Sequence, residues 1–280
     1  MHFISIIIIV FIFNACSVAD IRPEGFNPNE PESEQIAKWH LSKMQDAHGG
    51  KEAWLNKKYA VYQLRDFWPS WVLRTLVMPW DFSGQKIKIT SSLGDDNGRL
   101  EFLEGESLGS SWGIQNWATY HKLNNNSVEF IENDKIKFWI PTLKYFAELP
   151  FRIHEAPLVR YIGRSFRHEK QYHKIYATWH SLEPNSTYDQ YVLWINTQSY
   201  LVDYVEYTVR DMMASAKGIL FYYDYRDIDG IKVPFGMRVL DDPDDNNSVM
   251  HDMVLKSVYY TDKIETAYIF PQPDKKANKH

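Results

Sequence analysis

The sequence has a single cysteine, Cys16, among 280 residues, which excludes an intrachain disulfide framework. It also lacks an excess of basic charge, because 31 Lys and Arg residues stand against 36 Asp and Glu residues, a formal net charge of -5. No long Lys/Arg block is present either. Proteins that bind nucleic acids neutralise phosphates with basic side chains. We therefore expect no nucleic-acid partner.

Long hydrophobic runs are also scarce, and the one at the amino terminus is too short to span a bilayer. It covers about ten residues up to Phe13, whereas a spanning helix needs roughly 20. Such a run is typical of a signal-peptide core, and Ala15 followed by Cys16 resembles a bacterial lipobox. We predict a signal peptide over residues 1–15 and lipidation of Cys16. The alternatives are an ordinary signal peptide cut near Ala19, or a lone buried cysteine.

Two features of this leader depart from the usual lipobox pattern. No Lys or Arg precedes the apolar run, and Phe13-Asn14 stands where a leucine and a small residue are usual. A cysteine placed directly after Ala15 nevertheless favours lipidation over the alternatives. The two or three acyl chains of a bacterial lipoprotein would give stable anchoring in a membrane.

Apolar and aromatic side chains are abundant. Hydrophobic residues make up 44% of the chain, and aromatic residues 15%, with 10 Trp, 18 Tyr and 15 Phe. This supply is sufficient for a sizeable core and excludes disorder of the whole chain. The number of rings is compatible both with a filled core and with a core that contains a cavity.

The amino-terminal part is predicted to be a tether followed by helices. Residues 16–32 contain three prolines and few large apolar groups, so we interpret them as a lipid-anchored tether. Ser33 is a plausible helix N-cap, and Gly49-Gly50 is a typical helix stop. A second short helical turn is predicted over 52–55. We place one domain over residues 33–265 and a carboxyl-terminal tail over 266–280.

Most of this domain alternates with the period of two that is typical of strands bounded by turn residues. The alternation between apolar and mixed positions over 201–209 is typical of antiparallel strands with one buried face. Asp229-Gly230 is a strong hairpin signal, because both turn positions need positive φ. The predicted strands are 60–68, 71–78, 85–90, 99–104, 112–121, 159–163, 171–180, 188–195, 200–210, 217–226, 231–240 and 250–261.

One long helix interrupts the strands. Apolar residues recur at intervals of three and four over 136–149, while Lys144 and Glu148 lie off this stripe. Pro141 is expected to start or kink this helix, and Pro150 to end it. Because no βαβ alternation is present, we predict a mainly β (α+β) fold. In it, one antiparallel sheet of about ten strands curves around one or two helices.

Two overlapping G-x-S-x-G patterns, centred on Ser107 and Ser111, are the only hint of catalysis. In α/β-hydrolases this pattern lies on a sharp turn between a strand and a helix. Here a Gly-rich loop is followed by a strand-like segment. We therefore expect no catalytic residue and keep a serine hydrolase as the less favoured alternative.

The sequence also offers no convincing metal site. His168-Glu169 and His173 are spaced one residue too widely for H-E-x-x-H, and the segment is predicted to be a hairpin. His40 and His48 are eight residues apart and do not converge on one helix face. The acidic stretch 241–247 lacks the EF-hand order, so we interpret it as a solvated turn with at most incidental calcium binding. No metal or cofactor is expected.

Three segments carry a resemblance to a known family: Ala47-His48-Gly49-Gly50-Lys51-Glu52-Ala53-Trp54, Phe138 to Arg152, and Tyr225 to Pro234. With these segments, the chain resembles a family of uncharacterised bacterial lipoproteins, similar in outline to the LolA/LolB-like carriers and receptors of lipoprotein sorting. The resemblance covers about residues 33–265 and implies a curved antiparallel half-barrel, closed by helices, that binds acyl chains in its concavity.

We therefore expect a non-catalytic envelope lipoprotein that binds a lipid or another hydrophobic small molecule inside the half-barrel. Trp139, Leu143 and Phe146 are the candidate ligand-binding residues. The expected location is the bacterial cell envelope, with the Cys16 lipid in a membrane, on the periplasmic face of the outer membrane. The alternative is a structural or interaction module with a filled core, and the sequence identifies no protein partner.

Overall fold

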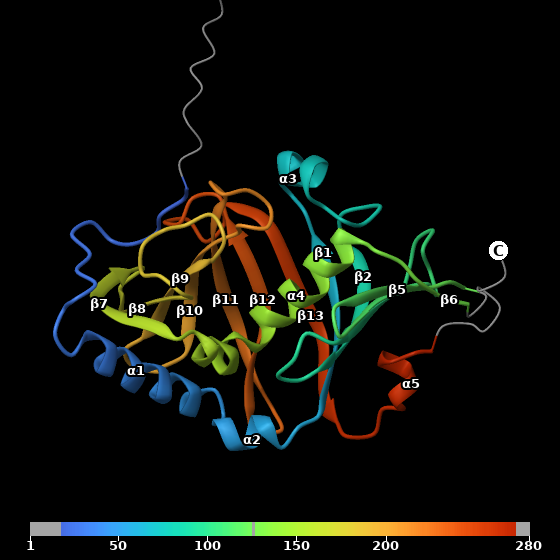
Figure 1. Cartoon of the computed structure of the whole chain (residues 1–280), viewed down its shortest axis with the longest axis horizontal. Helices are drawn as coiled ribbons and strands as arrows, with labels where there is room; N and C mark the ends of the chain where they lie inside the picture. The colour runs from blue at the N-terminus through green and yellow to red at the C-terminus, as the bar shows by residue number, and fades with distance from the viewer. Residues whose placement is uncertain (1–17, 125–126, 273–280) are drawn as a thin grey trace, which may run out of the picture.

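The fold is one antiparallel sheet of 13 strands that curves around helices without closing (Figure 1). The computed structural model describes residues 18–124 and 127–272. The strand order is β6-β5-β4-β3-β2-β1-β13-β12-β11-β10-β9-β8-β7, so the two outer strands, β6 and β7, remain unpaired with each other. This confirms the mainly β half-barrel, with more strands than the predicted ten.

The strands and helices have the following bounds. The strands are β1 Tyr59–Phe67, β2 Gln85–Ser92, β3 Gly98–Phe102, β4 Ser111–Gln115, β5 Ala118–Lys122, β6 Val128–Phe130, β7 Leu158–Arg167, β8 Lys170–Thr178, β9 Gln190–Asn196, β10 Val202–Thr208, β11 Lys217–Ile228, β12 Ile231–Leu240 and β13 Val249–Thr261. The helices are α1 Ser33–Ala47, α2 Lys51–Leu55, α3 Trp71–Leu76, α4 Asp134–Arg152, the 3-10 turn Ile153–Glu155 and α5 Thr266–Ile269.

The path of the chain through the sheet places α4 on the concave side. The chain begins at the middle of the sheet with β1 and moves outward strand by strand to the edge strand β6. Helix α4 then crosses to the opposite edge, β7, and the remaining strands return to the middle, where β13 pairs with β1 (Figure 1). One helix therefore links the two halves of the sheet.

Local irregularities accompany the curvature of the sheet. The register shifts between Gln63 and Leu64 where β1 meets β13, and between Tyr161 and Arg164 where β7 meets β8. Such bulges bend a strand and increase its twist. The Asp229-Gly230 hairpin is confirmed, with φ of 51° and 84°. The His168-Glu169 segment is also a hairpin turn, as predicted.

Two of the predicted strands differ from the structure. The segment 71–78 contains helix α3 instead of a strand, because the Ser70 hydroxyl caps it by accepting from the backbone N–H of Leu73 at 3.3 Å. The segment 112–121 forms two strands, β4 and β5, because the chain turns at Asn116 and Trp117, which have φ of 47° and 65°. Strand β6 was not predicted.

Helix α4 also extends further than predicted. Its N-cap is Asn133, whose side-chain oxygen accepts from the N–H of Ile136 at 3.1 Å. Pro141 and Pro150 both lie inside the helix, so Pro150 does not end it. A proline removes only one N–H, and Pro150 lies in the last turn, where the backbone still closes through the Ile153 N–H to the Leu149 carbonyl.

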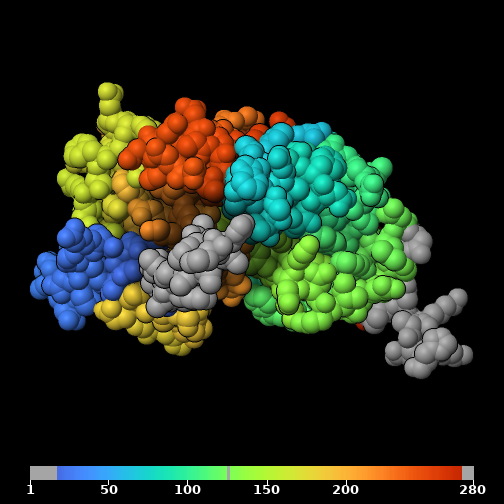
Figure 2. All heavy atoms as spheres, turned by 90° about the horizontal axis from the view of Figure 1, so that it is seen from above, coloured from blue at the N-terminus to red at the C-terminus, as the bar shows by residue number. Residues whose placement is uncertain are grey.

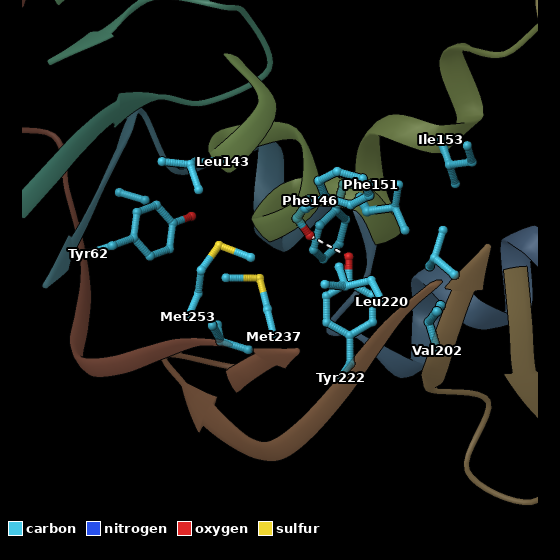
Figure 3. Packing of buried hydrophobic residues seen from close by; sticks show 14 of the residues in the cluster. Tyr62, Leu143, Phe146, Phe151, Ile153, Val202, Leu220, Tyr222, Met237 and Met253 are labelled. Atoms are coloured by element: carbon cyan, nitrogen blue, oxygen red, sulfur yellow. Dashed lines mark hydrogen bonds between the residues drawn. The ribbon is translucent and has the colours of Figure 1, made fainter. Parts of the chain in front are cut away.

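The concave side of the sheet holds the main core. Side chains of α4 meet the inner faces of the strands there, and the hydroxyl of Tyr222 donates to the Phe146 carbonyl at 2.7 Å (Figure 3). A smaller cluster covers the convex side over β8 to β11, where Phe26 packs on Tyr176 with ring centroids 5.2 Å apart. The segment before α1 therefore packs on the outer face of the sheet.

The turn between β2 and β3 is held by two charged residues of α4 that lie inside the protein. Lys144 and Glu148, which the sequence pattern leaves off the apolar stripe, are each only 1% exposed. Lys144 Nζ donates to the carbonyls of Ser92 and Asp95 at 3.0 Å and to that of Asn97. The two charges are buried because the turn offers backbone partners that a periodicity argument does not count.

Helix α1 packs on β7, and its carboxyl-terminal end contacts the hairpin between β11 and β12. The helix ends at Ala47, just before the predicted Gly49-Gly50 stop. The His48 carbonyl accepts from the backbone N–H of Lys232 at 2.9 Å, which fastens this corner to the sheet. No helix among residues 18–124 and 127–272 is both long and apolar enough to cross a membrane.

Candidate functional site

An apolar cavity of about 370 Å³ lies between α4 and the concave face of the sheet. Its wall combines residues of α4, of strands β9 to β13 and of the segments around α3. The lining residues are Trp68, Leu73, Val77, Asp96, Phe138, Trp139, Pro141, Thr142, Leu143, Tyr145, Phe146, Asp189, Tyr191, Tyr207, Thr208, Val209, Asp211, Met212, Ala216, Lys217, Gly218, Leu220, Val239, Leu240, Met250, His251 and Met253.

The structure brings the three candidate ligand-binding residues together at this cavity. Trp139, Leu143 and Phe146 all line it, since spacings of four and three residues place them on one face of α4. Leu143 and Phe146 point toward the sheet in Figure 3, opposite Met253 and Tyr222. The predicted lipidation site, Cys16, lies outside the described residues.

Tyrosines give the cavity wall a polar component. The hydroxyl of Tyr145 is buried and has no hydrogen-bond partner within the described chain. Burial raises the pKa of Tyr145, of its neighbour Tyr191 and of Tyr207, so all three phenols stay protonated at neutral pH. A protonated phenol without a partner can donate to a ligand oxygen.

The wall also contains a hydrogen-bonded network that sequence reasoning missed. Asp66, at the end of β1, is fully buried and accepts through Oδ2 from the indole N–H of Trp68 at 2.6 Å and from that of Trp80. Its Oδ1 lies 2.5 Å from Nε2 of His251, and the rings of His251 and Trp68 stack with centroids 3.8 Å apart. The contributing strands, β1 and β13, are distant in sequence, so no local motif marks the network.

The mouth of the cavity lies between α3 and the connection from β10 to β11. Leu73 and Val77 line it on one side, and Met212 and Ala216 on the other. Figure 2 looks down on this end and shows a hollow beside α3, drawn in cyan. Lys217 lies on this side as well, with its side chain exposed.

Three carboxylates line the same cavity: Asp96, Asp189 and Asp211. Burial raises the pKa of Asp189, against the lowering effect of the bonds that it accepts. Those bonds come from the Arg210 N–H at 2.8 Å and the Thr208 hydroxyl at 2.9 Å. The polar parts of the wall are therefore richer in acceptors and negative charge than in cations.

The serine patterns lie away from this cavity. Ser107 is in a turn, and its hydroxyl contacts Asp81 at 3.4 Å. Ser111 begins β4, and its buried hydroxyl accepts from Nε of Arg99 at 3.1 Å. The second pattern runs into strand β4 at Ser111, so neither serine lies on a strand-to-helix turn. No histidine is bonded to either serine in the described chain.

The histidines form pairs that differ from those considered in the sequence. His40 of α1 and His173 of β8 lie with ring centroids 3.7 Å apart, whereas His48 packs on Tyr225 at 5.6 Å. Within the described residues, no group of three or more His, Cys, Asp or Glu side chains could hold a metal ion. In the acidic turn 241–247, Asp242 accepts from the N–H of Asp244 at 2.9 Å, as expected of a turn-forming residue.

A half-barrel with a lined concavity is the architecture of the LolA/LolB-like fold, and comparison with solved structures shows this fold. A putative outer membrane lipoprotein-sorting protein domain from Vibrio parahaemolyticus superposes with a TM-score of 0.55 and 11% identity, over 87% of this chain and 97% of that one. A DUF1329 family protein from Desulfovibrio piger gives a TM-score of 0.53 and 12% identity, over 85% and 97%.

A LolA superfamily protein from Nitrosomonas europaea is similar too, with a TM-score of 0.50 and 10% identity, over 84% of this chain and 97% of that one. No protein-family model matches the sequence, and no curated protein matches it significantly. The likeness therefore rests on the fold and not on sequence.

Proposed function

We propose that this chain is a non-catalytic envelope lipoprotein that binds a lipid or another hydrophobic ligand in its half-barrel. In this proposal, Cys16 carries the acyl chains that hold it in a membrane, at the periplasmic face of the outer membrane. Trp139, Leu143 and Phe146 contact the ligand. The apolar cavity under α4 is the observation that carries the proposal, because its volume and aromatic lining are those of small-molecule sites.

The fold supports the same proposal. The similar structures include proteins described as lipoprotein-sorting or LolA-superfamily members. The match to this chain extends over nearly the whole length of each of them. A rigid concave sheet with a single helix over it can enclose an acyl chain, while backbone groups remain paired within the sheet.

Uptake of an uncharged fluorescent dye, N-phenyl-1-naphthylamine, by the full chain tests the proposal, together with native mass spectrometry of protein from its own host. We expect saturable fluorescence and co-purifying lipid. Ala216→Trp should fill part of the mouth and weaken dye binding at least fivefold. Ala118→Trp, an equal change at an exposed position of β5 away from the cavity, is the matched control. An apo mass together with absent dye binding would refute the proposal.

The other class of function, an interaction module with a filled core, has less support. Its defining property is a solid concave side, whereas a cavity lies there. A serine hydrolase is disfavoured by the positions of Ser107 and Ser111. If the wild-type protein hydrolyses esters and the Ser107→Ala, Ser111→Ala double variant does not, the serine hydrolase becomes the favoured function.

A further inference from the structure

The buried network at the cavity wall offers one polar group to the interior. A carboxylate can only accept hydrogen bonds, so the hydrogen between Asp66 and His251 belongs to Nε2 of the imidazole. In its neutral form, a ring that carries its hydrogen on Nε2 has Nδ1 as an acceptor. No described residue hydrogen-bonds to Nδ1, and His251 lines the cavity.

The network is also held rigidly, as a binding group must be. The Asp66 carboxylate accepts hydrogen bonds from two indole N–H groups and one imidazole N–H. Trp68 also stacks on one face of the His251 ring. Trp139 of α4 lies edge-on to the same ring, with centroids 6.4 Å apart. Rigid positioning reduces the entropy cost of each bond to a ligand.

We propose that His251, oriented by Asp66, binds the hydroxyl head group of an otherwise apolar ligand. This inference rests on the proposed function, because it names the class of ligand that the same cavity takes. An acceptor nitrogen matches a donating hydroxyl. A carboxylate head group is disfavoured, since Asp96, Asp189 and Asp211 line the cavity and Lys217 is the one Lys or Arg among the lining residues.

A chain-matched series tests the head group. Dodecanol, dodecyl methyl ether, dodecanoate and dodecylamine compete against N-phenyl-1-naphthylamine at pH 8.5 on the full chain. We expect dodecanol to bind about three to ten times more tightly than the ether, the range that one net hydrogen bond gives, and dodecanoate to bind more weakly than the alcohol. His251→Phe should bind the alcohol and the ether within twofold of each other.

The outcomes separate this inference from the proposed function. If neither the dye nor any of the four compounds binds, the hydrophobic-ligand function itself is refuted. If the dye and the ether bind but the alcohol shows no preference, or if the amine binds more tightly than the alcohol, only the hydroxyl assignment is overturned. Should His251→Phe fail to fold, the ¹⁵N signal of Nδ1 in the wild-type protein decides: it should shift with the alcohol and not with the ether.

A second, independent observation concerns the outer surface around the cavity mouth. Trp71 and Leu76 of α3 are 70% and 74% exposed, and Met212 and Met213 across the mouth are also exposed. Exposed apolar side chains gathered at one place mark interaction sites, whereas single ones are ordinary. The two sides face the same end of the molecule, because Leu73 and Met212 line one cavity.

The first described residues lie at this end as well. The N–H of Ala19 donates to the Ala214 carbonyl at 2.9 Å, and Arg210 donates to the Ala19 carbonyl at 2.6 Å. Cys16 is three residues earlier in the sequence, and three residues of fully extended chain span at most about 11 Å. An acyl chain on Cys16 would therefore enter a membrane next to the cavity mouth.

We infer that this end, with Trp71, Leu76, Met212 and Met213, docks on the surface of a lipid bilayer. The occupant is an uncharged or zwitterionic lipid surface, since the adjoining turn carries the exposed Asp241, Asp242, Asp244 and Asp245. That turn adjoins α3, because the Ser70 N–H donates to the Met250 carbonyl at 3.3 Å. Docking would bring the cavity mouth against the lipid that it receives or delivers.

Flotation with phosphatidylcholine vesicles tests this inference in a Cys16→Ser background, where no acyl chain contributes. We expect the protein to float with the vesicles, and the Trp71→Ser, Leu76→Ser double variant to reduce the bound fraction at least fivefold. The matched control is Trp39→Ser, Leu55→Ser. It removes one exposed Trp and one exposed Leu, 52% and 59% exposed, from α1 and α2 at the opposite end (Figure 1).

Vesicles containing phosphatidylglycerol should bind less protein, because the acidic turn repels them. Absence of flotation, equal loss in both double variants, or tighter binding to anionic vesicles would overturn the bilayer assignment. A change in oligomeric state confined to Trp71→Ser, Leu76→Ser would instead assign the face to a second copy of the chain.

Discussion

At the scale of single residues, the interior is more polar than an apolar pattern suggests. Lys144, Glu148, Asp66 and His48 are all buried, although each can carry a charge. Burial lowers the pKa of Lys144 and raises that of Glu148, because both charged forms lose water. Such groups make stability sensitive to their partners and to pH.

The buried His48 should make the protein less stable in mild acid. Burial lowers the pKa of His48 to about 4, whereas the same ring in the unfolded chain titrates near 6.5. The unfolded state therefore binds the proton first. The stabilisation is complete above pH 6.5, is lost as the pH falls toward 4, and amounts to about 3 kcal/mol.

Urea unfolding at pH 7.5 and pH 4.5 checks this expectation. His48→Gln should lose less stability between the two pH values than the wild type does. Part of the loss should remain, since burial also lowers the pKa of His40 to about 4. His168→Asn, in an exposed hairpin turn, should keep the wild-type dependence on pH. An unchanged slope in His48→Gln would contradict the assignment.

We expect Glu148 to contribute several kcal/mol to the free energy of unfolding, since it is a buried charge with specific partners. Its carboxylate accepts from the Ser91 hydroxyl at 2.7 Å and from the Gly94 N–H at 3.2 Å, and Lys144 lies one helical turn earlier. Glu148→Ala leaves those donors without a partner and removes the negative charge nearest to Lys144 on α4, and we expect a loss of about 3–5 kcal/mol in the free energy of unfolding.

A double-mutant cycle that combines Glu148→Ala with Lys144→Met measures the coupling energy between the two residues. The double variant should be more stable than the sum of the two single losses predicts, because it removes both charges together. Strict additivity in urea unfolding would show that Glu148 acts through the β2–β3 turn alone and not through Lys144.

At the scale of elements, the sequence predicted the regular parts and missed where local chemistry competes with periodicity. The second half of the sheet and the Asp229-Gly230 hairpin were foreseeable, since alternation and turn residues agree there. The segment 71–78 is predicted to be a strand because it is rich in large apolar residues, whereas Trp71 to Leu76 forms helix α3. The Ser70 cap is a local signal for this helix, and only the exposure of its side chains depends on the tertiary structure.

Two adjacent glycines, Gly49 and Gly50, make a matched pair of tests for the corner between α1 and α2. Both have positive φ, 117° and 86°, so alanine strains either position. A Cβ on Gly49 would also collide with the carbonyl oxygen of Gly230 in the β11–β12 hairpin, whereas one on Gly50 would meet nothing within 4 Å.

We expect Gly49→Ala to cost at least about 2 kcal/mol more than Gly50→Ala in chemical unfolding. The difference isolates the contact with the hairpin, because the backbone strain is common to both variants. Equal losses would mean that this corner is not packed on the sheet as closely as described.

At the scale of the whole molecule, the half-barrel was predictable, but whether it is hollow was not. Trp139, Leu143 and Phe146 follow from the apolar stripe of α4, because helical spacing alone places them on one face. The network of Asp66, His251 and their tryptophans depends on the pairing of β1 with β13, which no periodicity specifies. The same holds for the additional strands, since β6 has only three residues.

The central position of β13 predicts how the chain tolerates truncation. Removal of the residues after 262 deletes α5, whose main contacts are with β3 and β4, and should leave a folded protein. Removal of the residues after 248 deletes β13 and leaves β1 and β12 each with one unpaired edge in the middle of the sheet, so folding should fail. Circular dichroism and limited proteolysis distinguish the two results.

The pairing of the first strand with the last also sets the order of events during synthesis. Tyr59 of β1 emerges about 200 residues before its partner Thr261. Throughout that interval, the amino-terminal half of the sheet has a long unpaired edge that is open to other chains. A protein built this way depends on being kept apart from its neighbours until translation is almost complete.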